Sequence, residues 1–278
     1  MAPRRPYNAK SLSKNVTLTS RNAGLHGALM SITDLKDVAA LKRVGAAVAL
    51  ARDTMGQQLR PGMTTRELDE IGREVLTRAG ARSAPQLAYR FPACTCISVN
   101  DEVAHGVPSN RVLREGDLVN VDVSAELDGY WADTGASFAV GTVSAEHQKL
   151  LASTRAALAD ALHEVKTGAP LRNIGRAVET RARQSGFRVI DNLSGHGVGR
   201  FIHEKPDVPN TFDRRNKALL TEGLVIAIEP FLSTGATSVY EALDGWTLKT
   251  PDGSVTAQFE HTVIVTANGP LVITATAA

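Results

Sequence analysis

The stretch VNVDVSAELDGYWADTGASF, residues 119–138, decides the fold because it contains two strands and the turn between them. Apolar and polar residues alternate on both sides of a central Asp-Gly dipeptide, which favours a type I′ hairpin turn. A two-residue turn places Asp133 opposite Ser124 and makes Asp122 its diagonal neighbour on the same face. The stretch therefore predicts an antiparallel hairpin with two carboxylates on one face.

Helices and strands are predicted in blocks around this hairpin. Apolar periodicity and capping signals predict two helix pairs, at 34–60 with 67–80 and at 147–165 with 171–186. Strand-like sequence follows each pair, at 95–100, 118–127 and 130–140, then at 224–231 and 257–266. The order of elements predicts an α+β fold with antiparallel strands and with the helices grouped on one side.

A short repeat indicates that the chain has two related halves. The pattern I-G-R-x-V-x-x-R-A occurs at residues 71–79 and again at 174–182. Two helices of similar composition could also share nine positions by chance. No interdomain linker separates the halves, and we predict one domain over residues 30–278.

The composition is that of a globular chain. Its 278 residues are 43% hydrophobic, which is enough to bury a large core. No apolar run reaches the roughly 18 residues of a membrane span, and no secretion signal follows the basic N-terminus. Cys94 and Cys96 are too close together for a disulfide between them to hold a domain together, and two cysteines are too few for a four-ligand zinc cluster. We expect a reducing compartment, the cytoplasm, and no contact with membranes.

The first 29 residues differ in charge from the rest of the chain. They carry five basic and no acidic side chains, which leaves 26 basic against 29 acidic residues elsewhere. That balance argues against a general polyanion binder, and we expect no sequence-specific nucleic-acid partner. The leader could be a disordered arm, an organelle transit peptide or sequence upstream of a true start at Met30. We favour a disordered basic extension.

Four carboxylates occupy positions where a strand would bury them. Asp122 and Asp133 share the hairpin face, Glu229 ends an apolar run, and Glu260 interrupts the strand-like AQFEHTVIV. A buried carboxylate requires a positive partner, and basic residues are nearly absent from these strands. Together with the glycine-flanked His196 of SGHGVGRFIHEKP, the economical explanation is a dinuclear divalent metal centre.

Six motifs in the chain have a recognisable order and spacing. They are CISVNDEVAHGVP (96–108), VNVDVSAELDGYWADT (119–134), SGHGVGRFIHEKP (194–206), IAIEPF (226–231), DGWTLKT (244–250) and AQFEHTVIVT (257–266). With them, residues 34–275 resemble the type I methionine aminopeptidases of the pita-bread metallopeptidase family. The resemblance implies a pita-bread fold, whose two pseudo-symmetric halves form an antiparallel sheet backed by helices. It also implies a hydrolase that removes N-terminal methionine, with a preference for a small second residue.

The resemblance implies a metal centre and catalytic groups. The five metal ligands would be Asp122, Asp133, His196, Glu229 and Glu260. They would hold two divalent ions, for which Fe(II), Mn(II), Co(II) and Zn(II) are all suitable. Glu229 would also act as general base. His203 would stabilise the oxyanion, and His105 would hydrogen-bond near the scissile amide.

The resemblance also implies a pocket for the methionine side chain. The matching positions are Cys96, Phe91, Ile202 and Trp246. Ile202 stands where the family usually has an aromatic residue. Ala88 or Tyr89 falls where another aromatic residue is common. Each pocket residue could equally belong to an ordinary core.

The expected partners are the N-terminal peptides of newly made proteins, and the ribosome is a candidate partner. We expect the protein to be a monomer. One competing interpretation is a pita-bread aminopeptidase that cleaves before proline. Such enzymes carry an additional N-terminal domain, which 29 leader residues cannot supply. The other is a non-catalytic pita-bread protein that binds peptides, nucleic acid or other proteins after losing its ligands, whereas all five positions here keep the right residue type.

Overall fold

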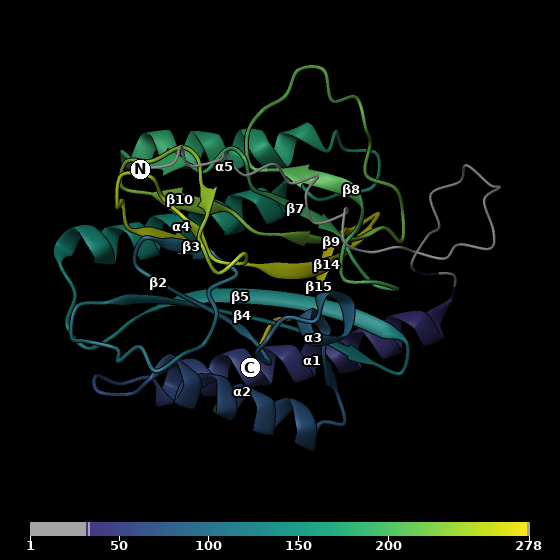
Figure 1. Ribbon diagram of the computed structural model, residues 1–278. Coiled ribbons are helices and arrows are strands. Elements are labelled where there is room, and N and C mark those ends of the chain that lie inside the picture. Colours follow the sequence, from purple (N-terminus) through teal and green to yellow (C-terminus); the bar gives the residue numbers. More distant parts are fainter. Residues whose placement is uncertain (1–31, 33, 277–278) are drawn as a thin grey trace.

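The strands lie between two pairs of helices (Figure 1). The structure is a computed structural model that describes residue 32 and residues 34–276, so the predictions for residues 1–29 and for Met30 lie outside the described residues. One pair is α1 (Leu35–Gln58) with α2 (Thr65–Arg78), and the other is α4 (Ala145–His163) with α5 (Arg172–Ser185). Each pair covers the outer face of its own half, so the predicted α+β fold is confirmed and the helices lie on one side of the strands within each half.

Two larger antiparallel sheets carry the architecture, and two smaller sheets complete it. In the first sheet, β4 pairs with the other three strands; its members are β1 (Arg82–Ser83), β2 (Cys96–Val99), β4 (Leu118–Leu127) and β5 (Tyr130–Ala139). The second has the order β15 (Gly269–Val272), β14 (His261–Thr266), β9 (Val225–Ile228), β7 (Ser194–Gly197), β8 (Glu204–Pro209). The first small sheet has the order β13 (Thr256–Gln258), β10 (Phe231–Ser233), β6 (Arg188–Val189). The second has the order β11 (Tyr240–Glu241), β12 (Leu248–Lys249), β3 (Glu102–Ala104).

The β4–β5 hairpin has the predicted register. Asp128 and Gly129 have φ values of 53° and 82°, as a type I′ turn requires, and Ser124 pairs with Asp133. The valines of β4 are fully buried in the core that also contains Leu41 and Val48 of α1. Because side chains alternate across a strand, the intervening polar residues of β4 point to the opposite face. The packing of α1 thus fixes which face of the hairpin can carry a site.

The helix boundaries follow the capping signals of the sequence. Asp34 caps α1 and Thr64 caps α2, each in a capping box with the acidic residue three positions later. The two copies of the repeat both lie in the second helix of a pair, α2 and α5. Each repeat glycine faces a close neighbour: a Cβ on Gly72 would lie 2.6 Å from the Met55 sulfur, and one on Gly175 would lie 2.2 Å from a backbone oxygen. The repeated Gly is therefore needed for packing in both halves.

Two predicted strands are interrupted in the structure, and two further segments contain elements that were not predicted. The predicted strand 224–231 breaks between β9 and β10 at Glu229 and Pro230, because a proline cannot donate to a sheet. The predicted strand 257–266 is β13 and β14, with Phe259 and Glu260 between them bonded to the other sheet. The glycine-rich stretch SGHGVGRFIHEKP contains β7 and begins β8. A short helix, α3 (Ala84–Tyr89), was not predicted at all.

The two larger sheets meet along β5 and β14. The Thr262 hydroxyl donates to the backbone oxygen of Asp133 at 2.7 Å and accepts from its backbone N–H at 3.0 Å. The Glu260 N–H donates to the Gly135 carbonyl at 2.9 Å. These bonds bring Asp133 and Glu260, from different halves of the chain, to the same place.

Two expectations from composition can be compared with the described residues. Among them, no helix is both long enough and apolar enough to cross a membrane. Cys94 and Cys96 are both buried free thiols. Burial raises the pKa of the Cys94 thiol to about 11, which keeps it protonated near neutral pH.

Asp69 of α2 holds the segment that leads into β2, and its removal should destabilise the fold. Its buried carboxylate accepts the backbone N–H of Thr95 at 2.7 Å and that of Cys94 at 3.2 Å. Asp69→Ala leaves these buried donors unpaired, so we expect the free energy of unfolding to fall by about 3 kcal/mol. Urea denaturation of metal-loaded protein measures the change.

The matched control for this prediction is the neighbouring Glu70. Asp69 pairs with Arg73 at 3.3 Å, and the exposed carboxylate of Glu70 pairs with the same arginine at 2.9 Å. Glu70→Ala should change the free energy of unfolding by no more than about 0.5 kcal/mol. Equal losses in the Asp69→Ala and Glu70→Ala variants would show that the ion pair, and not the buried amide bonds, matters.

Candidate active site

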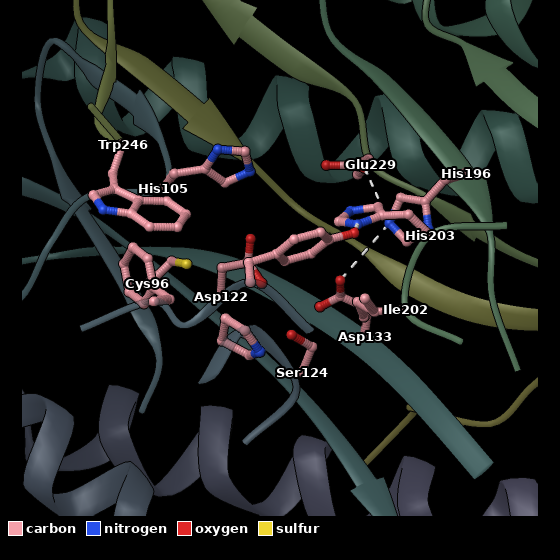
Figure 2. Close-up of a pocket in the computed structure, with 13 residues that line it drawn as sticks. Cys96, His105, Asp122, Ser124, Asp133, His196, Ile202, His203, Glu229 and Trp246 are labelled. Carbon is pink, nitrogen blue, oxygen red and sulfur yellow. Dashed lines mark hydrogen bonds and ion pairs between the residues drawn. The ribbon is translucent and has the colours of Figure 1, made fainter. Parts of the chain in front are cut away.

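One pocket gathers side chains from both halves of the chain. Its empty volume is about 580 Å³, part of which is open to solvent. Its lining residues are Pro85, Tyr89, Phe91, Cys96, His105, Asp122, Ser124, Asp133, His196, Ile202, His203, Glu229 and Trp246. In the view of Figure 2, Cys96 and Trp246 lie at one end, and His196 and His203 lie at the other. Every predicted site residue except Glu260 lines this pocket.

The sheet registers explain why the carboxylates converge. Asp122 and Asp133 project from neighbouring strands on the face of the hairpin that points away from α1. In the second sheet, His261 of β14 pairs with Ile228 of β9, so the register extended by one residue places Glu260 opposite Glu229. Glu260 is 1% exposed and lies behind the pocket wall, which is why it does not line the pocket.

His196 completes the polar end of the pocket. Ligand atoms of Asp133, His196 and Glu260 all lie within 4.8 Å of one another. The Nε2 atom of His196 is 3.7 Å from a carboxylate oxygen of Asp133 and 3.7 Å from one of Glu229 (Figure 2). Its Nδ1 lies 2.9 Å from the Gly197 carbonyl oxygen, which can only accept. That bond places the proton on Nδ1 and leaves the Nε2 lone pair facing the carboxylates.

Within the part of the chain that the structure describes, no lysine or arginine pairs with the carboxylates of this cluster. Burial, followed by the negative charges of neighbouring carboxylates, raises the pKa of Asp122, Glu229 and Glu260 well above the ordinary range. Burial also raises the pKa of Asp133. One buried oxygen of Asp133 and one of Glu260 accept no hydrogen bond from the described residues. Oxygen donors with unused lone pairs beside an imidazole nitrogen fit divalent cations.

Gln258 supports the cluster, although sequence analysis did not single it out. Its Nε2 donates to Glu260 at 3.1 Å, and its Oε1 accepts from Asn120 at 2.8 Å. A Cβ on Gly135 would lie 2.1 Å from the Gln258 amide, so only glycine leaves room for it. The motif AQFEHTVIVT could have indicated this role of Gln258. Gln258 stands two residues before Glu260 and so lies on the same face of an extended segment.

The two histidines predicted to face the substrate both line the pocket. His105 follows β3 with a φ of 55°, a left-handed conformation that the bonds of Gly106 to Ile97 and Ser98 hold in place. Burial, and then the charge of His196, lower its pKa to about 4, so that the ring is neutral near neutral pH. The His203 ring centroid lies 4.3 Å from that of His196. Neither His105 nor His203 belongs to the group of ligand atoms described above.

The apolar end of the pocket contains three of the four predicted side-chain contacts, whereas Ile202 lies near Asp133 in the view of Figure 2. Phe91 and Cys96 are buried, and the partly buried Trp246 packs against them. The rings of Phe91 and Trp246 meet edge to face with centroids 5.2 Å apart. Ile202 is 2% exposed and belongs to the main core. The structure thus brings together an apolar recess and a carboxylate cluster in one pocket.

A polar cluster suited to divalent cations, placed beside an apolar recess in a two-sheet fold, defines a metal-dependent hydrolase. The chain belongs to metallopeptidase family M24, whose sequence profile matches residues 39–267. It is 48% identical to methionine aminopeptidase 2 of Bacillus subtilis over 247 residues, which span 88% of this chain and 99% of that relative. It is 52% identical to a methionine aminopeptidase of Staphylococcus epidermidis over 86% of this chain and 96% of that relative.

Solved structures agree with the sequence relatives. The methionine aminopeptidase of Rickettsia prowazekii has a TM-score of 0.84 at 34% identity, over 88% of this chain and 99% of that one. This likeness confirms the predicted pita-bread fold. The prolidase of Pyrococcus furiosus has a TM-score of 0.71 at 22% identity, over 90% of this chain and 67% of that one. The second likeness shows the shared fold alone.

Proposed function

We propose that this chain removes the N-terminal methionine from proteins and peptides, with a preference for a small second residue. The observation that carries the proposal is the single pocket in which the carboxylate cluster with His196 adjoins the recess of Phe91 and Trp246. The first end suits hydrolysis and the second suits a thioether side chain. The methionine aminopeptidases among the relatives support the same conclusion.

The proposed metal centre consists of five side chains and two divalent cations. Asp122, Asp133, His196, Glu229 and Glu260 would hold the cations, with Fe(II), Mn(II), Co(II) and Zn(II) as the candidates for this donor set. When bound, the cations polarise the scissile carbonyl and make a bound water more acidic. The unpaired oxygens of Asp133 and Glu260 are the observation that supports this assignment.

The other roles belong to side chains of this chain. Glu229, on the pocket wall, would accept the proton of the attacking water. His203 would donate a hydrogen bond to the developing oxyanion, and His105 would hydrogen-bond near the scissile amide or its leaving nitrogen. The free α-amine of the substrate would bind among the carboxylates. Cleavage would then be restricted to chain ends.

The methionine side chain would occupy the apolar recess. Phe91 and Trp246 meet edge to face there, Cys96 packs against them, and Ile202 lines another part of the same pocket. Burial raises the pKa of the Cys96 thiol well above its usual range, so the thiol is neutral and serves as a small apolar surface. An unbranched, polarizable side chain suits a recess of aromatic edges and a thiol.

Turnover by metal-free protein reconstituted with each candidate metal in turn tests this function. We expect free methionine from Met-Ala-Ser and no release from N-acetyl-Met-Ala-Ser, because acetylation removes the α-amine that selects chain ends. Ala-Pro-Ser tests the competing enzyme that cleaves before proline. Cleavage of Ala-Pro-Ser alone would replace our proposal with that specificity. Peptide affinity in protein that takes up no metal would indicate a binding protein instead.

The proposed substrates place the chain where new proteins are made. Their N-terminal peptides are the partners we propose, in the cytoplasm, with a monomeric enzyme that can meet them at the ribosome. Sedimentation equilibrium tests the monomer, and co-sedimentation with ribosomes at physiological salt tests the contact. These assignments depend on the proposed substrate.

We also propose that residues 30–278 are the single catalytic domain and that the basic leader, residues 1–29, takes no part in it. A chain that begins at Met30 should keep its kcat and melting temperature, because the leader contains few apolar residues that could join a core. Steady-state kinetics and thermal unfolding of the two chains side by side measure the difference. A large loss of either property would show that the leader is docked or functional.

A further inference from the structure

Tyr89 provides a contact to the active-site histidines that the roles above do not use. Its hydroxyl oxygen lies 2.5 Å from Nδ1 of His203, and the two ring centroids are 5.4 Å apart. Both residues line the pocket. No hydrogen bond joins the other ring nitrogen, Nε2, to any of the described residues. The contact therefore engages one side of the imidazole and leaves the other side for a substrate.

The direction of this hydrogen bond decides which tautomer His203 adopts. A phenol is the more acidic partner, and an unprotonated imidazole nitrogen is the more basic one, so the hydroxyl of Tyr89 donates to Nδ1. A neutral imidazole carries a single proton, which must then be on Nε2. Only this tautomer offers an N–H toward the pocket.

The fold holds Tyr89 in a defined place. Tyr89 is the last residue of α3, and the helix ends there because Arg90 adopts a left-handed conformation. The helix is capped by Ser83, which pairs with Ala125 of β4, the strand that carries Asp122. The ring of Phe201 packs edge to face against Tyr89, with centroids 6.5 Å apart. The hydroxyl is thus anchored to the same sheet as the carboxylates.

We propose that Tyr89 is a positioning residue that holds His203 in the tautomer with a proton on Nε2, ready to donate to the substrate oxyanion. The proposal rests on the proposed function, because it assumes that His203 acts in peptide hydrolysis. Tyr89 acts through His203 and needs no contact with the reacting atoms. In its absence the imidazole is free to rotate and to exchange between two tautomers, one of which cannot donate into the pocket.

The variant that tests the proposal is Tyr89→Phe, which removes the hydroxyl and keeps the ring that packs against Phe201. We expect kcat on Met-Ala-Ser to fall about tenfold, with KM and metal content little changed. In a His203→Ala background the same substitution should have almost no effect on kcat, because the group that it positions is gone. An equal fall in both backgrounds would overturn the proposal.

A matched control is Tyr130→Phe. Tyr130 is the first residue of β5, and its hydroxyl donates to Asp37 of α1 at 2.6 Å, outside the pocket. This substitution also removes a tyrosine hydrogen bond, but kcat should stay within about twofold of the unsubstituted chain. A tenfold loss in Tyr130→Phe would show that kcat responds to general destabilisation.

The tautomer itself can be observed without turnover. Nitrogen NMR of histidine-labelled, Zn(II)-loaded protein at pH 8 distinguishes a protonated from an unprotonated ring nitrogen, and the His203→Ala variant assigns the signals. We expect an unprotonated Nδ1 in His203, and a mixture of tautomers after Tyr89→Phe. A proton on Nδ1 in the unsubstituted chain would overturn the proposal. Absence of methionine release with every metal would instead contradict the proposed function, while the NMR result would still report on Tyr89.

Discussion

Asp133→Asn is expected to lower metal content and to reduce kcat/KM on Met-Ala-Ser by about 10³-fold or more. Asp133 lies at the centre of the cluster: it is 3.7 Å from His196, shares the ligand group with Glu260 and is the diagonal neighbour of Asp122 in the hairpin. An amide keeps its size but supplies no charge to the cations. Metal analysis after dialysis, beside steady-state kinetics, measures both effects.

The stability of the metal-free variant separates lost coordination from lost folding. Asp133→Asn removes one negative charge from a buried group of carboxylates, so the melting temperature of metal-free protein should stay the same or rise. Added metal should raise that temperature in the unsubstituted chain and have little effect on the variant. Two tightly bound metal ions in Asp133→Asn would contradict the assignment of Asp133 as a ligand.

Asp128→Asn is the control within the same hairpin. Asp128 lies at the turn, its side chain is 64% exposed, and its partner Arg43 is 55% exposed. Asparagine tolerates the left-handed backbone that this position requires. Metal content and kcat should therefore be unchanged. A loss of metal in Asp128→Asn would mean that any disturbance of the hairpin empties the site.

The hairpin was predictable because its information is local. The Asp-Gly turn determines the register, and the register determines that Asp122 and Asp133 share a face. The capping boxes of α1 and α2 are likewise contained within four consecutive residues. Local patterns of this kind can be read without knowing what the rest of the chain does.

The breaks in the second sheet depend on long-range contacts and were not predictable from pattern alone. Residues 257–266 alternate as one strand would, yet the strand breaks because Glu260 donates its N–H to Gly135, 125 positions earlier in the chain. Helix α3 has only six residues and no apolar periodicity that a pattern could detect. Tyr89, at its end, was recognised only as falling near a position where aromatic residues are common. Its contact with His203 joins residues 114 positions apart.

Replacing His203 or His196 should also have a large effect on activity, and the two replacements should differ in their effect on metal content because the two neighbouring rings are assigned different roles. His196 directs Nε2 at the carboxylates of Asp133 and Glu229. His203 lies beside it, but its Nδ1 is engaged by Tyr89 and it is not part of the ligand group. If the assignments hold, replacing one ring removes metal and replacing the other removes a transition-state hydrogen bond.

His203→Ala should lower kcat by roughly 10²- to 10³-fold and leave KM comparatively unchanged, because an oxyanion donor acts chiefly in the transition state. Its metal content should equal that of the unsubstituted chain. His196→Ala should lose metal as well as activity, since alanine cannot fill the coordination position that the imidazole vacates. Metal stoichiometry and steady-state kinetics on Met-Ala-Ser, measured on the same preparations, distinguish the two. Loss of metal in His203→Ala, or near-normal turnover by it, would mean that the roles of the two histidines are assigned wrongly.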